Sequence, residues 1–229
     1  MKSTSERQQN RDQEGADAQV LLTLSLAPNV SEGMTLIPSL SEGLLCASYT
    51  RQGGFLMSIS QSLIPELDQE AATTRKLLER VPADKFGWKP HERSMTMGRL
   101  ATHVAEMVGW MNTTLTTEKL DFAPPGGEPM VPYEPKSSAD LLAFFDKNVK
   151  EAQAALVKAT DQDMMRNWSL MSGGNVIFTM PRIACIRGMI MNHVIHHRGQ
   201  LSVYLRLNNI PVPAMYGPSA DENTFAAAS

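Results

Sequence analysis

Residues 191–206 read MNHVIHHRGQLSVYLR, and this stretch decides both the fold and the position of the candidate site. It holds three of the five histidines of the chain inside an apolar run with helical spacing. His193 and His197 are four residues apart, so on an α-helix their side chains lie on one face, one turn apart. Two imidazoles in this arrangement can share one metal ion. A third ligand must then come from another segment.

The candidate for the third ligand is His103, which lies in a helix predicted over about 95–117. On a wheel of 100° per residue, Met107 and Trp110 fall within about 60° of this histidine. Glu106 lies at the margin of the same face. His103 is therefore predicted to face inward. A lone inward histidine is more often a hydrogen-bonded core residue than a ligand, so the metal interpretation depends on the other two histidines.

The last helix is predicted over about 181–208, because Pro181 suits a first helical turn and Pro211 prevents continuation. With His193 as the reference on its wheel, Arg198 points elsewhere. We expect the buried face, within about 40° of the reference, to carry Arg182, Ile186, Met189, His197, Gln200 and Tyr204.

Two further helices are predicted over 58–80 and 138–159 from apolar stripes at helical spacing. The connection over 118–136 is rich in proline and glycine and is expected to be a long loop without a helix of its own. Such a loop lets the helices that it joins run parallel, as in bundles with a crossover connection. The sequence therefore predicts an all-α four-helix bundle.

Local signals mark two more features. Ser137 followed by Asp140 has the pattern of a capping box at the start of the third helix. Residues 161–180 are irregular, and their centre, SLMSGGNVIF, is compatible with a short hairpin that turns at Gly173 and Gly174.

The two ends of the chain are predicted to lie outside the bundle. Residues 1–56 lack helical periodicity and strand alternation, and we expect a disordered or loosely attached N-terminal extension. The domain is expected over 57–222, followed by a short C-terminal tail at 223–229. One hypothesis is that the native polypeptide begins at Met57, where the pattern changes to that of an ordinary domain start.

Composition excludes several classes of protein. The 21 Lys and Arg are scattered and balanced by 24 Asp and Glu, so the basic stripe of a nucleic-acid-binding surface is absent. No run reaches the roughly 18 apolar residues of a membrane span, and the first residues are not net positive as in a secretory leader. Cys46 and Cys185 cannot form a disulfide framework. We expect a cytoplasmic protein with neither nucleic acid nor membrane as partner.

Three neutral imidazoles form the ligand set that zinc and other borderline divalent ions prefer. A structural zinc site is usually closed by four ligands, and no fourth strong ligand is evident here. The pattern favours an open site with a coordination position for a water or a thiolate, and no catalytic residue of the protein is assigned. The HExxH pattern of metalloproteases is absent, because Val194 stands where its general base would be.

Two residues near the candidate site keep alternative interpretations. Glu70 is predicted either to accept a hydrogen bond from a ligand histidine or to be a solvated or locally paired carboxylate. His196 lies about 60° from His193 on the wheel. It is expected either to contact the ligands or to form an interhelical hydrogen bond.

Three segments carry a resemblance to a known family: LATHVAEM at 100–107, NHVIHHRGQLSVYLR at 192–206 and IPVPAMYGPSADE at 210–222. Together they look like the DinB-like superfamily of bacterial metal-binding four-helix bundles, over about 57–222. The resemblance implies helices in up-down-down-up order. It also implies a metal triad of one histidine on the second helix and two on the fourth, which map onto the following residues: His103, His193 and His197.

Relatives in that superfamily include transferases that join thiols such as bacillithiol or mycothiol to electrophiles, and a mycothiol-dependent isomerase. The resemblance thus implies a metal-dependent thiol transferase that acts on a small electrophile and forms a homodimer. The ion is expected to be zinc or nickel, with manganese and iron also open. The alternatives are a non-catalytic, stress-associated metal-binding protein and a metal-dependent hydrolase. The residues predicted to line the pocket or contact the ligands are Glu106, Met107, Trp110, Met189, His196, Gln200 and Tyr204.

Overall fold

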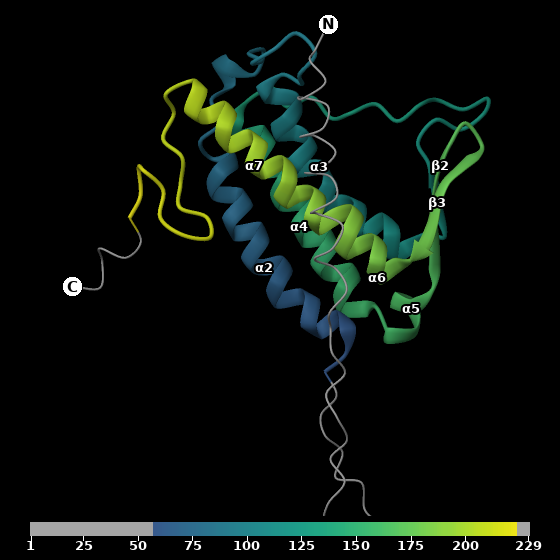
Figure 1. The fold of residues 1–229 in the computed structure, drawn as a ribbon. Helices are drawn as coiled ribbons and strands as arrows, with labels where there is room; N and C mark the ends of the chain where they lie inside the picture. Colours follow the sequence, from purple (N-terminus) through teal and green to yellow (C-terminus); the bar gives the residue numbers. More distant parts are fainter. Residues whose placement is uncertain (1–56, 224–229) are drawn as a thin grey trace, which may run out of the picture. The chain divides into compact units, whose positions relative to one another are not determined.

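The computed structural model of the chain describes residues 57–223. The extension predicted at 1–56 and most of the tail predicted at 223–229 lie outside these residues. Four long helices dominate the described part (Figure 1): α2 (Ile59–Leu78), α3 (Met97–Thr116), α4 (Ser138–Lys158) and α7 (Asn192–Leu207). Shorter elements are η1 (Ala83–Lys85), α5 (Asp161–Met165), α6 (Arg182–Ala184) and η2 (Cys185–Met191). The strands are β1 (Lys119–Asp121), β2 (Asn167–Ser172) and β3 (Asn175–Pro181).

The first three long helices begin at side-chain caps. The hydroxyls of Ser58, Thr96 and Ser137 each accept a hydrogen bond from a backbone N–H in the first turn of the helix that follows. Such a cap satisfies a donor that has no partner within the helix. Half of the capping box predicted at Ser137 is present, because Asp140 N donates to the Ser137 hydroxyl at 3.0 Å. The Asp140 carboxylate accepts instead from Lys136 N and the Tyr133 hydroxyl. The three helices lie close to their predicted bounds.

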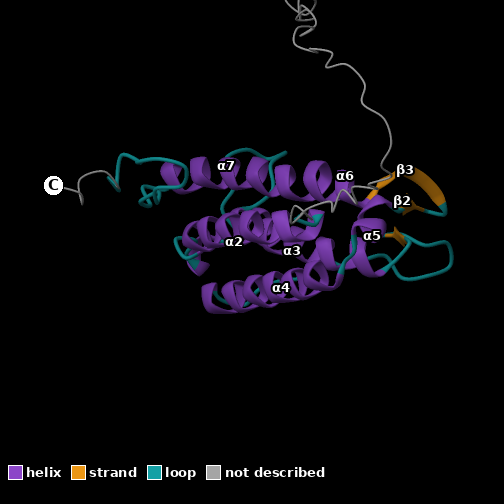
Figure 2. Cartoon of the chain, turned by 90° about the horizontal axis from the view of Figure 1, so that it is seen from below, coloured by secondary structure: helices purple, strands orange, loops and turns teal. Residues whose placement is uncertain are grey.

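Contacts between helix ends fix the directions of the helices. The Ser138 hydroxyl donates to the Val81 carbonyl at 2.7 Å, so α4 begins beside the end of α2 and runs antiparallel to it. The Tyr204 hydroxyl donates to the Met95 carbonyl at 3.3 Å, so α7 ends where α3 begins. Figure 2 shows α6 and α7 along one side, α2 and α3 in the middle and α4 on the opposite side. Both α4 and α7 thus pack against α2 and α3.

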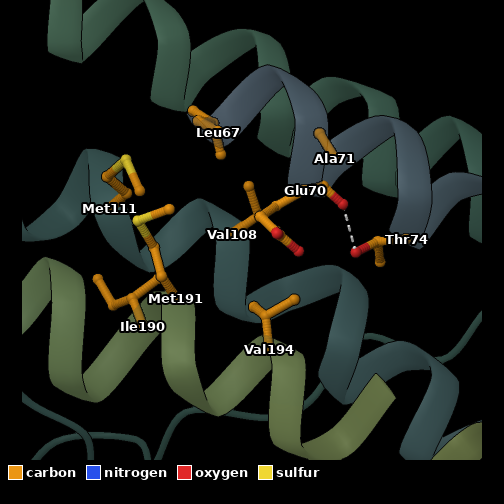
Figure 3. Close-up of a pocket in the computed structure, with 9 residues that line it drawn as sticks. All are labelled: Leu67, Glu70, Ala71, Thr74, Val108, Met111, Ile190, Met191 and Val194. Carbon is orange, nitrogen blue, oxygen red and sulfur yellow. Dashed lines mark hydrogen bonds between the residues drawn. The ribbon is translucent and has the colours of Figure 1, made fainter. Parts of the chain in front are cut away.

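The core lies between these helices and is built from apolar residues of all four. Representative members with almost no exposed surface are Leu77, Val104, Phe145 and Leu201. A small cavity of about 20 Å³ remains among apolar side chains of α2, α3 and the last helix, with Glu70 and Thr74 at its edge (Figure 3). This volume suits a single water and no larger ligand.

The expectation of an all-α fold is wrong, because the described residues are mostly helical but include a three-stranded sheet in the order β1-β2-β3. β2 and β3 form the predicted hairpin, and Gly173 and Gly174 turn it with positive φ angles of 61° and 78°. β1 pairs in parallel with β2, starting with Lys119 beside Ser169. A three-residue strand that pairs with a segment some fifty positions later has no local pattern from which to predict it.

The helix predicted over 181–208 is continuous but not uniform. Residues 185–191 form a π-helix between α6 and α7. A π-helix has i→i+5 hydrogen bonds and more residues per turn than the 3.6 of an α-helix. A wheel of 100° per residue therefore misplaces side chains before Asn192. No helix among residues 57–223 is long and apolar enough to cross a membrane.

Candidate metal centre

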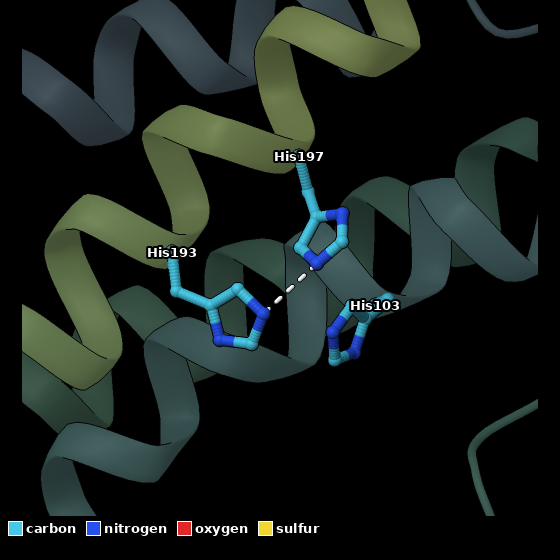
Figure 4. Close-up of side chains that lie close together, drawn as sticks. All are labelled: His103, His193 and His197. Atoms are coloured by element: carbon cyan, nitrogen blue, oxygen red, sulfur yellow. Dashed lines mark hydrogen bonds between the residues drawn. The ribbon is translucent and has the colours of Figure 1, made fainter. Parts of the chain in front are cut away.

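Three histidines from two helices meet in the structure (Figure 4). His103 comes from the second turn of α3, and His193 and His197 come from the first two turns of α7. One nitrogen of each ring lies within 4.8 Å of the corresponding nitrogens of the other two. His103 is buried, and the other two are partly buried. The antiparallel contact of α3 with α7 thus unites histidines that are 90 residues apart in the sequence.

The arrangement fits a shared divalent ion. The Nε2 atoms of His193 and His197 are 2.9 Å apart, and two lone pairs at this distance repel unless a proton or a cation lies between them. Zinc binds imidazole nitrogens at about 2.0–2.1 Å, so small rotations of the rings can bring all three nitrogens to one ion.

The outer nitrogens of two of the rings are held by acceptors one turn away. Nδ1 of His103 lies 2.8 Å from Oε1 of Glu106, and Nδ1 of His197 lies 2.7 Å from Oε1 of Gln200. A carboxylate or amide oxygen only accepts, so in both rings Nδ1 carries the proton. Nε2 of the neutral ring then presents its lone pair to the cluster, which is the tautomer that a metal ligand needs.

Glu106 is itself held in the charged form. Burial alone would raise the pKa of this carboxyl, but hydrogen bonds from His103 and Arg99, with the charge of Arg99, lower the pKa below its usual value. Nη2 of Arg99 donates to Glu106 at 2.8 Å. Glu106 therefore remains an anion beside His103, and the hydrogen bond that it accepts fixes the orientation of that ring.

His193 and His197 are kept neutral. Burial lowers the pKa of both rings, and the nearby His103 lowers each further, while the bond to Gln200 partly offsets this in His197. Nδ1 of His193 is buried and has no partner with hydrogen-bond geometry among residues 57–223, although the Met189 carbonyl acts to raise the pKa of this ring. Neutral imidazole is the form that binds a metal ion.

His196 is exposed and lies outside the cluster. Its Nε2 is 3.0 Å from Nε2 of Gln200, which donates the hydrogen bond, while the oxygen of the same amide accepts from His197. The interhelical bond considered for His196 is therefore not the one observed, because the bond lies within α7. His196 contacts the ligand candidate His197 in two ways: its ring packs edge-on against that of His197, with centroids 4.8 Å apart, and both rings bond to the amide of Gln200. Contact with the predicted ligands, one of the two alternatives for His196, is therefore observed.

A cavity of about 630 Å³ lies beside the cluster, between α3, α4, the sheet and the loop that follows β1. Glu106, Trp110 and Met189 line it, as predicted for a pocket next to the site. The histidines do not line it, but Trp110 does, and its ring packs edge-on against that of His103 with centroids 5.7 Å apart. The cavity thus adjoins the cluster through Trp110 and through Glu106, which lines the cavity and lies 2.8 Å from Nδ1 of His103.

Two residues predicted for the pocket lie elsewhere. Met107 is fully enclosed in the core and lines no part of the cavity. Tyr204 packs edge-on against Trp88, with ring centroids 5.5 Å apart, near the other end of α7. It follows His193 by eleven residues, about 16 Å along a helix. A helical wheel shows direction around the axis and not distance along it, which explains the error.

Sequence reasoning missed the role of Arg198, which is 1% exposed. Its guanidinium pairs with the Glu70 carboxylate at 2.7 Å and donates to the Thr74 hydroxyl at 3.0 Å. It also contacts the hydroxyl of Tyr216, which donates to Glu70 at 2.8 Å. Glu70 is thus locally paired, one of its two predicted alternatives, and contacts no histidine of the cluster. The signal in the sequence was an arginine in register with Val194 and other apolar residues of α7.

Comparison with known proteins identifies the class. The model of the DinB family matches residues 57–227, and the chain belongs to this family. It is 28% identical over 155 residues to the uncharacterized protein YrdA of Bacillus subtilis (strain 168), covering 67% of this chain and 85% of YrdA.

Two solved structures show the same fold. A DinB-like protein from Bacillus cereus ATCC 10987 aligns with a TM-score of 0.54 and 24% identity, covering 70% of this chain and 99% of that one. The DinB-like protein YjoA from Bacillus subtilis aligns with a TM-score of 0.52 and 20% identity, covering 66% of this chain and 96% of that one. At these identities the likeness concerns the fold alone.

Proposed function

We propose that this protein is a divalent-metal-dependent enzyme that joins a low-molecular-weight thiol to an electrophilic small molecule. His103, His193 and His197 would hold the ion, with zinc or nickel as the first choices. The four long helices would form the up-down-down-up bundle expected of the family, in a cytoplasmic homodimer. The observation that carries the proposal is the convergence of three imidazoles from two helices beside a cavity of about 630 Å³.

When bound, a divalent ion would act as a Lewis acid that lowers the pKa of a coordinated thiol or water. The residues of the chain would prepare the site for it. Glu106 and Gln200 orient two of the rings through their Nδ1–H groups. Trp110 packs edge-on against His103 and lines the cavity. The cavity would hold the electrophile against this ring.

The transfer needs no nucleophile from the protein. The sulfur of the thiol forms a bond to the electrophilic carbon, the bond from that carbon to the leaving group breaks, and the thiol proton departs with the displaced group. Orientation of the two reactants in one site supplies most of the advantage over the reaction in water.

A second candidate is a non-catalytic metal-binding protein in which the ion joins α3 to α7. The position of the ligands on two different helices favours it, since an ion there would cross-link them. It predicts that a chelator lowers the thermal stability of the wild-type protein and leaves that of His197→Ala unchanged, because a ligand bound only to the folded state stabilises it.

The experiment that separates these functions follows the consumption of thiol and electrophile by the metal-loaded full-length protein, over a panel of cellular thiols. The transferase predicts that both are consumed in equal amounts, and that His197→Ala abolishes this while His196→Ala does not. Loss of the electrophile without thiol would indicate a metal-dependent hydrolase. A fully metal-loaded protein that consumes neither thiol nor electrophile would support the non-catalytic role.

A further inference from the structure

We propose that the cavity of about 630 Å³ beside the histidines binds an uncharged aromatic molecule that donates a hydrogen bond to Asn148. This inference deepens the proposed function, and rests on it, only in assigning that molecule as the electrophilic substrate. Binding of the aromatic molecule needs neither a metal ion nor a thiol. The binding site and the proposed transferase activity can therefore be contradicted separately.

The walls of the cavity are aromatic on several sides. The volume falls within the roughly 300–1,000 Å³ of sites that enclose drug-sized molecules. Side chains from α3, the loop after β1, α4 and β2 supply five rings. Rings placed around a cavity offer faces and edges to a planar ligand, a contact that adds to the burial of apolar area. These rings belong to Trp110, Phe122, Tyr133, Phe144 and Trp168.

The wall opposite α3 is preformed. The Asp121 carboxylate accepts hydrogen bonds from the N–H groups of Gly173 and Gly174, which tie the start of the loop to the tip of the hairpin. Further along the loop, the Tyr133 ring stacks on Phe144 of α4, with centroids 4.3 Å apart. A loop fixed at both ends keeps the cavity open without a ligand, which lowers the entropic cost of binding.

The charges around the cavity argue against an anionic ligand. Arg99 is the one cation among the lining residues, and its Nη2 is paired with Glu106. Its other terminal nitrogen is enclosed by protein atoms, without a partner among residues 57–223, and does not reach the cavity. The remaining charge is that of Glu151, an exposed carboxylate 3.9 Å from Lys147. Removing an anion from water without a cation to pair with it is costly.

Asn148 supplies an acceptor that the protein leaves unused. It is 7% exposed, and its Nδ2 donates to the Ala105 carbonyl of α3 at 3.0 Å, which fixes the orientation of the amide. No residue among 57–223 donates to its Oδ1. Gly109 makes room for this oxygen, since a Cβ at that position would lie 2.9 Å from it. Both residues line the cavity, so a donor group on a bound molecule can reach this oxygen.

Three naphthalene probes test the inference on metal-free, full-length protein by equilibrium dialysis. 1-Naphthol is uncharged and donates a hydrogen bond, 1-methoxynaphthalene has a similar ring without the donor, and 1-naphthoate is an anion. We expect naphthol to bind at least about tenfold more tightly than either of the others, the factor that corresponds to one hydrogen bond of about 1.4 kcal/mol. Equal binding of the three probes, tighter binding of naphthoate, or no binding of naphthol would overturn the inference.

Two variants locate the contact. Asn148→Leu is expected to remove the preference for naphthol over methoxynaphthalene, and Gly109→Ala to weaken it by displacing the amide. Ile177→Ala, an exposed position of β3 that does not line the cavity, is the matched control and should bind as the wild type does. A preference that survives in folded Asn148→Leu contradicts the assigned contact. The ranking of the probes by the wild type decides the case if that variant does not fold.

The outcome can be separated from that of the proposed function. Naphthol binding without any turnover of thiol and electrophile would contradict the transferase and leave the aromatic site intact. Turnover of anionic electrophiles by a protein that does not bind naphthol would contradict the aromatic site and support the transferase.

Discussion

Neighbouring residues of α7 serve opposite purposes. His197 faces α3 with a neutral ring and a nitrogen that has only another imidazole for a partner, while Arg198 faces α2 with its charge paired and its donors satisfied. The two facing nitrogens need a proton or a cation between them, whereas the ion pair of Arg198 already has its partner. The comparison makes the histidine side of α7 the candidate metal site and the arginine side a structural contact.

The largest effect is expected from Arg198→Ala. Removing one partner of a buried ion pair leaves the Glu70 carboxylate unpaired, which typically costs about 3–5 kcal/mol. Urea unfolding of the metal-free protein measures this loss. Arg187→Ala is the control, because its pair with Glu66 is exposed and is expected to contribute no more than about 1 kcal/mol. A similar, small change in both variants would remove the distinction between the two sides of α7.

An intermediate effect is expected from Glu106→Gln on the histidine side. The substitution removes the anion that accepts from His103, and loss of such a partner typically lowers metal affinity by about 10–100-fold. Competition with a chromophoric chelator measures the affinity. Glu151→Gln, the same change at a cavity residue without contact to the histidines, should leave it unaltered. Equal losses in both would indicate a general effect of charge.

The smallest effect concerns pH. Since the pKa values of His193 and His197 are lowered in the folded protein, the unfolded chain binds more protons once the pH falls below the usual histidine value of about 6.5. The metal-free protein is therefore expected to lose stability as the pH falls from 7.5 to 5.5. Urea midpoints at several pH values test this, and the double variant His193→Gln/His197→Gln should show a flatter profile. A urea midpoint of the wild-type protein that rises as the pH falls would contradict this prediction.

The histidine side of α7 could be predicted from the sequence, and the arginine side could not. Residue spacing and helical wheels depend on local periodicity. This periodicity predicted the bounds of the long helices closely, and it predicted that His103, His193 and His197 face the interior. Arg198 was placed away from the histidine face, but a wheel contains no information about Glu70, which lies 128 positions earlier in the sequence. The structural role of a buried charged residue can be predicted only when the residue that pairs with it is known.

Errors elsewhere have equally specific causes. β1 was missed because its pairing with β2 is non-local. The π-helix at 185–191 shifts the hydrogen bonds of a continuous helix without a change in composition that would reveal it. The free acceptor of Asn148 depends on the approach of α4 to Gly109, which only the packed structure shows.

The most direct test of the metal centre is the metal content of full-length protein purified without a histidine tag. We predict about one divalent ion per chain for the wild type and for His196→Ala, the exposed neighbour outside the cluster. His103→Ala, His193→Ala and His197→Ala should each lose nearly all of it while remaining folded. A wild-type protein without metal, or a folded His197→Ala variant with a full complement of metal, would contradict the assignment of these three histidines as ligands.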